Sequence, residues 1–269
     1  MAARNVPRPN AIIRESPVCF GGRRRVGRSL GWHVKGTAPL INDPDDVESM
    51  VQGACKRFAR PVPEVCSKMK RRFRHFIRVW VRRHLSLLAA DTDVSLETYL
   101  ANTHYNESRK NQIRLAFKGF ALAAKDYRCK GFSKREVRMQ GHKPPKENRW
   151  INARSDSYKA AVGPIFKCIE AEVFKLPWFI KHVPVADRSR YIDGMIGRVG
   201  AGYVATDHTA YEAHFTPEVI ELIEATVYSY MTQRLPDGPE FMRVFRQGQT
   251  RPSITGNRAA VVTVGSRMS

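Results

Sequence analysis

The segment Gly202-Tyr203-Val204-Ala205-Thr206-Asp207-His208-Thr209-Ala210-Tyr211-Glu212-Ala213-His214-Phe215-Thr216-Pro217-Glu218 decides how the rest of the chain is interpreted. Residues 203–206 have the composition of a short strand, which would deliver the carboxylate of Asp207 at its end. A second carboxylate, Glu212, follows five residues later. Thr216 then suits a helix N-cap, and Pro217 suits the first helical position. Because Mg²⁺ prefers oxygen ligands, this stretch predicts a metal site.

Acid pairs at this spacing also arise by chance and are usually solvated, so the prediction depends on other stretches. One is Gly265-Ser266-Arg267-Met268-Ser269, the last residues of the sequence, which follow a strand-like run at 259–264. Ahead of that run, Gly256 and Asn257 are typical turn residues. Residues 253–264 are therefore predicted to form a β-hairpin.

Another supporting stretch lies upstream and is basic. It consists of Lys134-Arg135-Glu136 and, beyond a Gly- and Pro-containing loop at 140–146, of Arg149-Trp150-Ile151-Asn152-Ala153-Arg154. Residues 125–134 are predicted to include the strand that leads into it. Arginine forks and lysine point charges are suited to phosphate groups, but basic residues alone are a weak signal in so basic a chain.

In this order, the three stretches resemble motifs F, A and the start of motif B in the RNA-dependent RNA polymerases of tombus-like and noda-like positive-strand RNA viruses. In that family motif F joins Lys-x-Glu to a strand Arg-(aromatic or aliphatic)-Ile-x-x-Arg, motif A is Asp-x4-Asp after a strand, and motif B opens with Gly-(Ser/Thr)-Arg-x-Ser-Gly. The ordered set is more specific than any one motif. The resemblance implies an α+β fold: a right-hand polymerase fragment with a helix-rich N-terminal and fingers region and the first part of an antiparallel palm sheet.

The resemblance also implies roles for individual residues. Asp207 would bind the catalytic Mg²⁺ (or Mn²⁺), and Glu212 and Ser269 would recognise the ribose of the incoming nucleotide. Glu212 departs from the family, which has Asp at this position. The residues that would bind the triphosphate are Lys134, Arg135, Arg149 and Arg154. The residues that would form the motif B loop are Gly265, Ser266 and Arg267.

The family's motif C, Gly-Asp-Asp, does not occur in the sequence. We therefore expect an N-terminal portion of a polymerase, which cannot polymerise alone because a full metal site needs carboxylates from two strands. The expected segments are a basic flexible N-terminal segment at 1–40, a helical N-terminal and fingers region at 41–124, fingers with motif F at 125–200, and the start of the palm at 201–269. The rest of the palm and the thumb would be absent.

The composition of the chain limits the kinds of partner that it can bind. The 46 Lys and Arg residues against 25 Asp and Glu give a net charge of +21, which predicts a polyanionic partner. The five cysteines have neither zinc-site nor paired spacing, so reduced thiols are expected. Neither a signal peptide nor an apolar run of membrane-spanning length is present in the sequence.

A helix predicted at 64–90 carries much of the positive charge. Its apolar residues are predicted to face a core: Met69, Phe73, Phe76, Ile77, Trp80 and Leu87. Its cations crowd the remaining surface: Lys68, Lys70, Arg71, Arg72, Arg74, Arg78, Arg82 and Arg83. Such a density of like charge favours an RNA backbone as the partner; a membrane surface or a solvated face are the alternatives. Other helices are predicted to begin at 42–46, 95, 106, 165, 187 and 216.

The resemblance implies RNA template, RNA product and ribonucleoside triphosphates as partners, with viral replication proteins and the host membrane surface as further candidates. The host cytoplasm, at membrane-associated replication sites, is the implied location. Two alternatives stay open. A reverse transcriptase typically has an aromatic residue where this chain has Glu212, and a non-catalytic basic RNA-binding protein explains the charge without explaining the order of the motifs.

Overall fold

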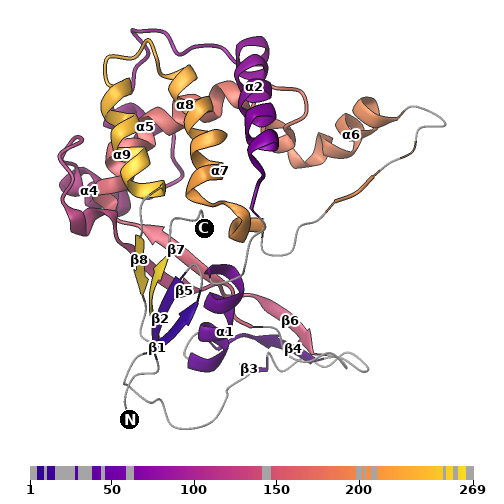
Figure 1. The fold of residues 1–269 in the computed structure, drawn as a ribbon, viewed down its shortest axis with the longest axis vertical. Coiled ribbons are helices and arrows are strands. Elements are labelled where there is room, and N and C mark those ends of the chain that lie inside the picture. Colours follow the sequence, from indigo (N-terminus) through magenta and orange to yellow (C-terminus); the bar gives the residue numbers. More distant parts are fainter. Residues whose placement is uncertain are drawn as a thin grey trace.

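The computed structural model describes residues 5–8, 11–15, 28–29, 38–43, 46–58, 64–140, 147–197, 202, 204–206, 211–250, 253–256 and 260–264. Helices gather at one end of the molecule, and a sheet with one covering helix forms the other (Figure 1). The strands are β1 Asn5–Arg8, β2 Ala11–Glu15, β3 Arg28–Ser29, β4 Ala38–Ile41, β5 Cys129–Ser133, β6 Val137–Gln140, β7 Trp150–Arg154, β8 Ser253–Gly256 and β9 Ala260–Val264. The α-helices are α1 Val47–Phe58, α2 Ser67–His84, α3 Leu96–Ala101, α4 Glu107–Ala116, α5 Asp156–Val173, α6 Arg188–Ile196, α7 Pro217–Leu222, α8 Glu224–Met231 and α9 Gly238–Gln249.

The main sheet has six strands in the order β1-β2-β9-β8-β5-β7. The hairpin predicted at 253–264 is confirmed as the antiparallel pair β8 and β9, and β5 pairs antiparallel with β7. β5 and β8 run parallel, so the sheet is mixed, whereas an antiparallel sheet was expected. A second sheet, β3-β4-β6, is antiparallel.

Parts of the N-terminal segment at 1–40, which was predicted to be flexible, form strands in the structure. Asn5–Arg8 and Ala11–Glu15 form a strand pair, and β2 pairs antiparallel with β9, with Ile13 opposite Val262. The reason is that β9 would otherwise leave one row of backbone groups unpaired, and the apolar run of β2 supplies the partner.

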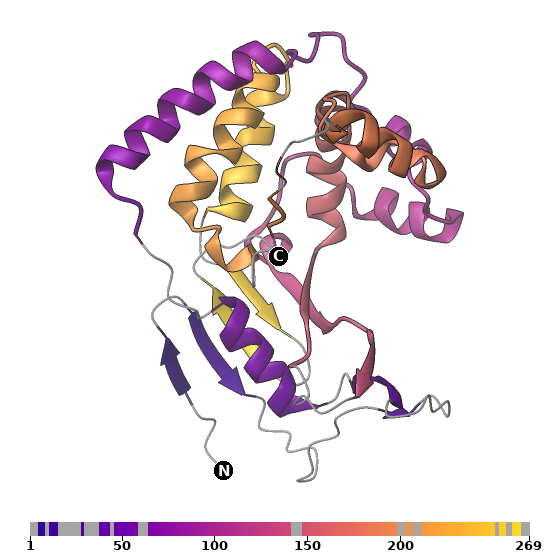
Figure 2. The same cartoon turned by 90° about the vertical axis from the view of Figure 1, so that its right-hand side faces the viewer.

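α1 covers one face of the main sheet (Figure 2). It begins as predicted, with the Asp46 carboxylate accepting the backbone N–H of Ser49 at 3.0 Å. Met50, Ala54 and Phe58 recur at four-residue spacing on one side of the helix, and each is at most 2% exposed. Phe58 meets Trp150 of β7 edge to face, with ring centroids 5.9 Å apart. This contact fixes α1 against the strand that carries the basic motif.

The helical end is built around α5, α8 and α9, with α2 packed along their outer side (Figures 1 and 2). Phe166 of α5 makes edge-to-face contacts with Phe241 and Phe245 of α9 and with Tyr228 of α8. A smaller cluster joins α3, α4 and α5 through Leu100, Ile113 and Ala160. The segments expected at 125–200 and 201–269 therefore share both a core and a sheet.

Several predicted helices have different bounds in the structure. α2 ends at His84 because Leu85 is extended, and Met69, Phe73 and Phe76, predicted to face a core, are 41%, 39% and 57% exposed. The predicted helix at 187–200 is α6, which ends at Ile196. The helix after Thr216 divides into α7 and α8 at Ile223.

α5 begins at Asp156, nine residues before the predicted start at 165. The Ser155 hydroxyl caps it by accepting the N–H of Tyr158 at 3.1 Å. The Gly163-Pro164 pair lies inside the helix. A Cβ on Gly163 would lie 2.8 Å from the Tyr99 ring, so this glycine permits α3 to pack closely on α5.

The strand predicted at 203–206 is not found. Residues 204–206 belong to no strand, and Val204 is 90% exposed, while Tyr203 lies outside the described residues. A strand needs a partner for its backbone groups, and none of the described strands pairs with 204–206. Among the helices that the structure describes, none combines the length and apolar character that crossing a bilayer requires.

Candidate functional site

The basic motif is assembled by the β5–β7 pair. Ser133 faces Trp150 in the register of the two strands, and the N–H of Lys134 donates to the carbonyl of Arg149 at 2.8 Å. Gly131 makes room for this pairing, because a Cβ there would lie 2.6 Å from the ring of Trp150. Two cations that are separated in the sequence by the loop at 140–146 thus become neighbours.

Glu136 holds these two cations together. One of its oxygens, Oε1, lies 3.0 Å from Lys134 Nζ and 2.6 Å from Arg149 Nη1. Burial acts to raise the pKa of Glu136, but the hydrogen bonds and charges of Lys134 and Arg149 outweigh it, so the pKa is lowered and the group is ionised at neutral pH. Both cationic side chains remain 45% exposed, so they can also meet an anion from solvent. Arg135 is exposed beside them.

Hydrogen bonds from the segment before α1 and the start of α1 hold the residues on both sides of the Lys134–Glu136–Arg149 contacts. Buried Asn42 donates from Nδ2 to Ser133 Oγ at 2.7 Å and accepts the N–H of Glu136 at 2.8 Å. Buried Asn148 donates from Nδ2 to the carbonyl of Asp43 at 2.6 Å, and its N–H donates to Ser49 Oγ at 2.8 Å. Sequence reasoning missed both asparagines, because their partners lie about 100 residues away in the chain.

α1 adds more charge to the site. Lys56 pairs with Glu147 at 2.6 Å. Burial lowers the pKa of Arg57, and the neighbouring charge of Arg149 lowers it further, against the opposing effects of Glu147 and Glu136. Four cations, Lys56, Arg57, Lys134 and Arg149, therefore gather around two carboxylates, which leaves a local charge of +2. Such an excess suits a polyphosphate.

Arg154 lies elsewhere and has structural partners. Its guanidinium donates to the carbonyl of Tyr127 at 2.9 Å, to the carbonyl of Gly248 and to Gln249 Oε1 at 3.3 Å, and it lies over the ring of Tyr158 at 5.2 Å. It therefore ties the end of β7 to the end of α9. Its role towards a triphosphate stays a prediction.

Most of the residues predicted to bind the metal ion or the ribose lie outside the residues that the structure describes. Asp207, Gly265, Ser266, Arg267 and Ser269 lie outside the described residues. Glu212 lies in a short 3₁₀ helix, Tyr211–His214, and its side chain is not described. Within the ranges that the structure describes, no three His, Cys, Asp or Glu side chains are grouped as a metal site would require.

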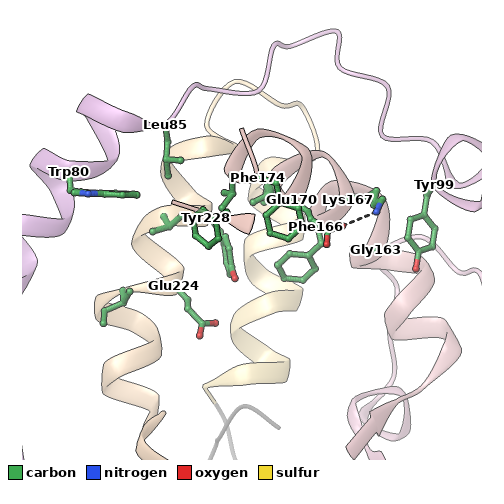
Figure 3. A pocket seen from close by; sticks show the side chains of 15 residues that line it. Trp80, Leu85, Tyr99, Gly163, Phe166, Lys167, Glu170, Phe174, Glu224 and Tyr228 are labelled. Carbon is green, nitrogen blue, oxygen red and sulfur yellow. Dashed lines mark hydrogen bonds and ion pairs between the residues drawn. The ribbon is translucent and has the colours of Figure 1, made fainter. Parts of the chain in front are cut away.

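A cavity of about 570 Å³ lies between α2, α5 and α8 (Figure 3). Its walls are largely apolar, and Lys167 and Glu170 form an ion pair of 2.8 Å on its lining. Glu224 of α8 also lines it, and burial raises the pKa of this carboxyl to about 7. Sequence reasoning did not find this site, because nothing in the local pattern distinguishes Glu224 from a solvated acid at a helix start.

Comparisons with known proteins bear on this arrangement only through the fold. No protein-family model matches the sequence, and no curated protein matches it. Among solved structures, the Sicinivirus 3Dpol RNA-dependent RNA polymerase is similar, with a TM-score of 0.55 over 95% of this chain, at 13% sequence identity. The fold is polymerase-like.

The chain spans 62% of the length of that polymerase. The likeness supports a polymerase-like fold and does not extend to the tombus-like or noda-like lineage, which rests on the motifs alone. In the structure, the β5–β7 pair beside the basic motif and the β8–β9 hairpin before Gly265 belong to one sheet.

Proposed function

We propose that this chain forms the nucleotide-binding part of an RNA-dependent RNA polymerase that replicates a positive-strand viral RNA. The observation that carries the proposal is the pair Lys134 and Arg149, held on Glu136 by the β5–β7 strands in a polymerase-like fold. An incoming ribonucleoside triphosphate would take over these cations from Glu136, because three phosphates offer more negative charge than one carboxylate.

In this proposal, the metal ligand of the chain is Asp207. Its carboxylate is the hard oxygen donor that Mg²⁺ or Mn²⁺ prefers, and the ion would activate a primer hydroxyl and stabilise the leaving pyrophosphate. Glu212 and Ser269 would contact the ribose, and Gly265, Ser266 and Arg267 would form the motif B loop. A second metal carboxylate would come from another strand of the complete palm.

A non-catalytic RNA-binding protein is the second candidate, favoured by the net charge of +21. It would use the basic surfaces but would need no triphosphate specificity. A reverse-transcriptase-like enzyme is less well supported, because Glu212 stands where such enzymes typically carry an aromatic residue.

Nucleotide binding separates these functions. We expect Lys134→Ala and Arg149→Ala each to weaken binding of a fluorescent ribonucleoside triphosphate by about tenfold or more, since each removes one charge-assisted contact of about 1.5–3 kcal/mol. Fluorescence anisotropy with Mg²⁺ present measures the affinity. Lys130→Ala, at an exposed position on β5, is the matched control. Equal affinities for all three variants and the unaltered chain would contradict the proposed triphosphate site.

A further inference from the structure

α2 carries a row of cations on one side. Arg71, Arg74, Arg78 and Arg82 recur at three- and four-residue spacing, and all four side chains are exposed. The row is about 16 Å long at 1.5 Å per residue. The helix contains no Asp or Glu, and within the described part of the chain none of these four arginines makes an ion pair with another element.

This arrangement is unfavourable for an isolated helix. Arg74, Arg78 and Arg82 are successive i,i+4 neighbours, and like charges at this spacing destabilise a helix by a few tenths of a kcal/mol per pair. α2 is nevertheless held in place by other contacts: Val81 is buried, and Lys70 pairs with Glu218 of α7 at 2.6 Å. The repulsion within the row therefore stays uncompensated by the described residues, and a polyanion would relieve it.

The apolar residues of α2 lie on a different side of the helix. At 100° per residue, the row formed by Met69, Phe73 and Phe76 lies about 180° from the arginine row, and the buried position Val81 lies between them. A membrane-surface helix places its apolar residues in the bilayer with cations flanking them at the same surface. A bilayer that touched Phe73 and Phe76 would leave the arginine row facing away, so the row fits a charged strand better than a lipid surface.

We propose that the arginine row of α2, Arg71, Arg74, Arg78 and Arg82, is an RNA-backbone binding surface separate from the nucleotide site. α2 lies along the outer side of α7 and α8, at the helical end of the molecule and away from β5 and β7 (Figures 1 and 2). Binding there is independent of base sequence, since guanidinium groups on an open helix reach phosphates without reading base edges. The surface holds template or product RNA while the nucleotide site turns over. The proposal extends the proposed function, but it does not require catalysis.

The test compares the salt dependence of RNA binding in the 269-residue chain and its variants. Arg71→Gln/Arg78→Gln/Arg82→Gln removes three charges from the row. The matched control, Lys125→Gln/Arg190→Gln/Arg234→Gln, removes three exposed charges elsewhere. Binding of a fluorescein-labelled single-stranded oligouridylate is followed by anisotropy at several salt concentrations, and helix content by circular dichroism. A third variant, with Lys at the three row positions, keeps the charge.

We expect the row variant to lower the slope of log affinity against log salt by about 2, at about 0.7 per lost phosphate contact, which is roughly a 100-fold loss of affinity at about 0.1 M salt. The Lys variant should keep most of the slope, and the control should change both quantities much less. Equal losses in the row variant and the control would show that the row is an ordinary solvated face and overturn the proposal. Unchanged RNA binding with lost binding to phosphatidylserine vesicles would overturn it in favour of a membrane surface.

These outcomes are independent of the nucleotide site. The row variant should bind the fluorescent ribonucleoside triphosphate as tightly as the unaltered chain, whereas Lys134→Ala and Arg149→Ala lower that affinity. Loss of RNA affinity without loss of triphosphate affinity supports the row. Failure of triphosphate binding in the unaltered chain would contradict the nucleotide site and leave the α2 surface standing.

Discussion

Glu224 is a carboxyl group whose protonation the fold changes. Burial raises its pKa from 4.5 to about 7, so the folded chain keeps a proton that the unfolded chain releases. Between these two pKa values the folded state binds more protons, and the contribution of Glu224 to stability therefore falls as the pH rises from about 4.5 to 7. We expect Glu224→Gln to increase the free energy of unfolding by about 1–2 kcal/mol at pH 8, less than the full shift implies because the group is partly solvated.

Urea unfolding at several pH values measures this effect. The difference between Glu224→Gln and the unaltered chain should shrink towards zero near pH 4, where both side chains are uncharged. Glu64→Gln, at an exposed position, is the control and should show no such trend. A difference that stays constant across the pH range would mean that the carboxyl is not shifted.

Among the elements, α1 connects the main sheet to the four cations of the candidate site, Lys56, Arg57, Lys134 and Arg149. Phe58 is 2% exposed and packs on Trp150, while the neighbouring Arg57 interacts electrostatically with Arg149. We expect Phe58→Ala to lower the free energy of unfolding by about 3–4 kcal/mol, through lost burial and the cavity left behind. It should also weaken triphosphate binding, because the Asn42 and Asn148 contacts depend on the position of α1.

The matched substitution for that measurement is Phe76→Ala on α2, where the ring is 57% exposed. It should change the free energy of unfolding by no more than about 0.5 kcal/mol. If urea unfolding shows comparable losses of unfolding free energy for the two variants, the packing of α1 on β7 contributes no more to stability than an exposed ring does.

Elements with strong local signals were predictable from the sequence. Thr216 caps a helix as predicted, and Ser95 and Asn106, predicted as helix starts, also cap theirs. Each side chain accepts the N–H of the residue three positions on. The β8–β9 hairpin was predictable because its turn residues and strand composition lie together. These features depend on a few adjacent residues, so a single sequence contains them.

Features that depend on distant partners were not predictable. The contacts of Asn42 and Asn148 join segments about 100 residues apart, and Arg154 reaches the end of α9 across 94 residues. The exposed side of α2 was predicted as core because helical periodicity shows that residues share a face without showing what covers it. Of the candidate site, the juxtaposition of Lys134 and Arg149 fits the predicted motif, while the contribution of α1 was missed.

At the scale of the whole molecule, one sheet joins segments from the two ends of the chain. β2 pairs with β9, and β8 pairs with β5, so the N-terminal strands, the basic motif and the hairpin before Gly265 form one structure. The excess positive charge is exposed both at the site and on α2. A polymerase would need both surfaces, one for the nucleotide and one for RNA.

The central claim is tested most directly by ribonucleotide incorporation on a primed RNA template, using the longest reading frame that encodes this chain. We expect incorporation that depends on Mg²⁺ or Mn²⁺ and is abolished by Asp207→Asn, with RNA affinity unchanged and with Asp237→Asn, at the exposed start of α9, as the control. Incorporation that survives Asp207→Asn would contradict the role of Asp207. RNA binding without any incorporation by the unaltered protein would instead favour a non-catalytic RNA-binding function.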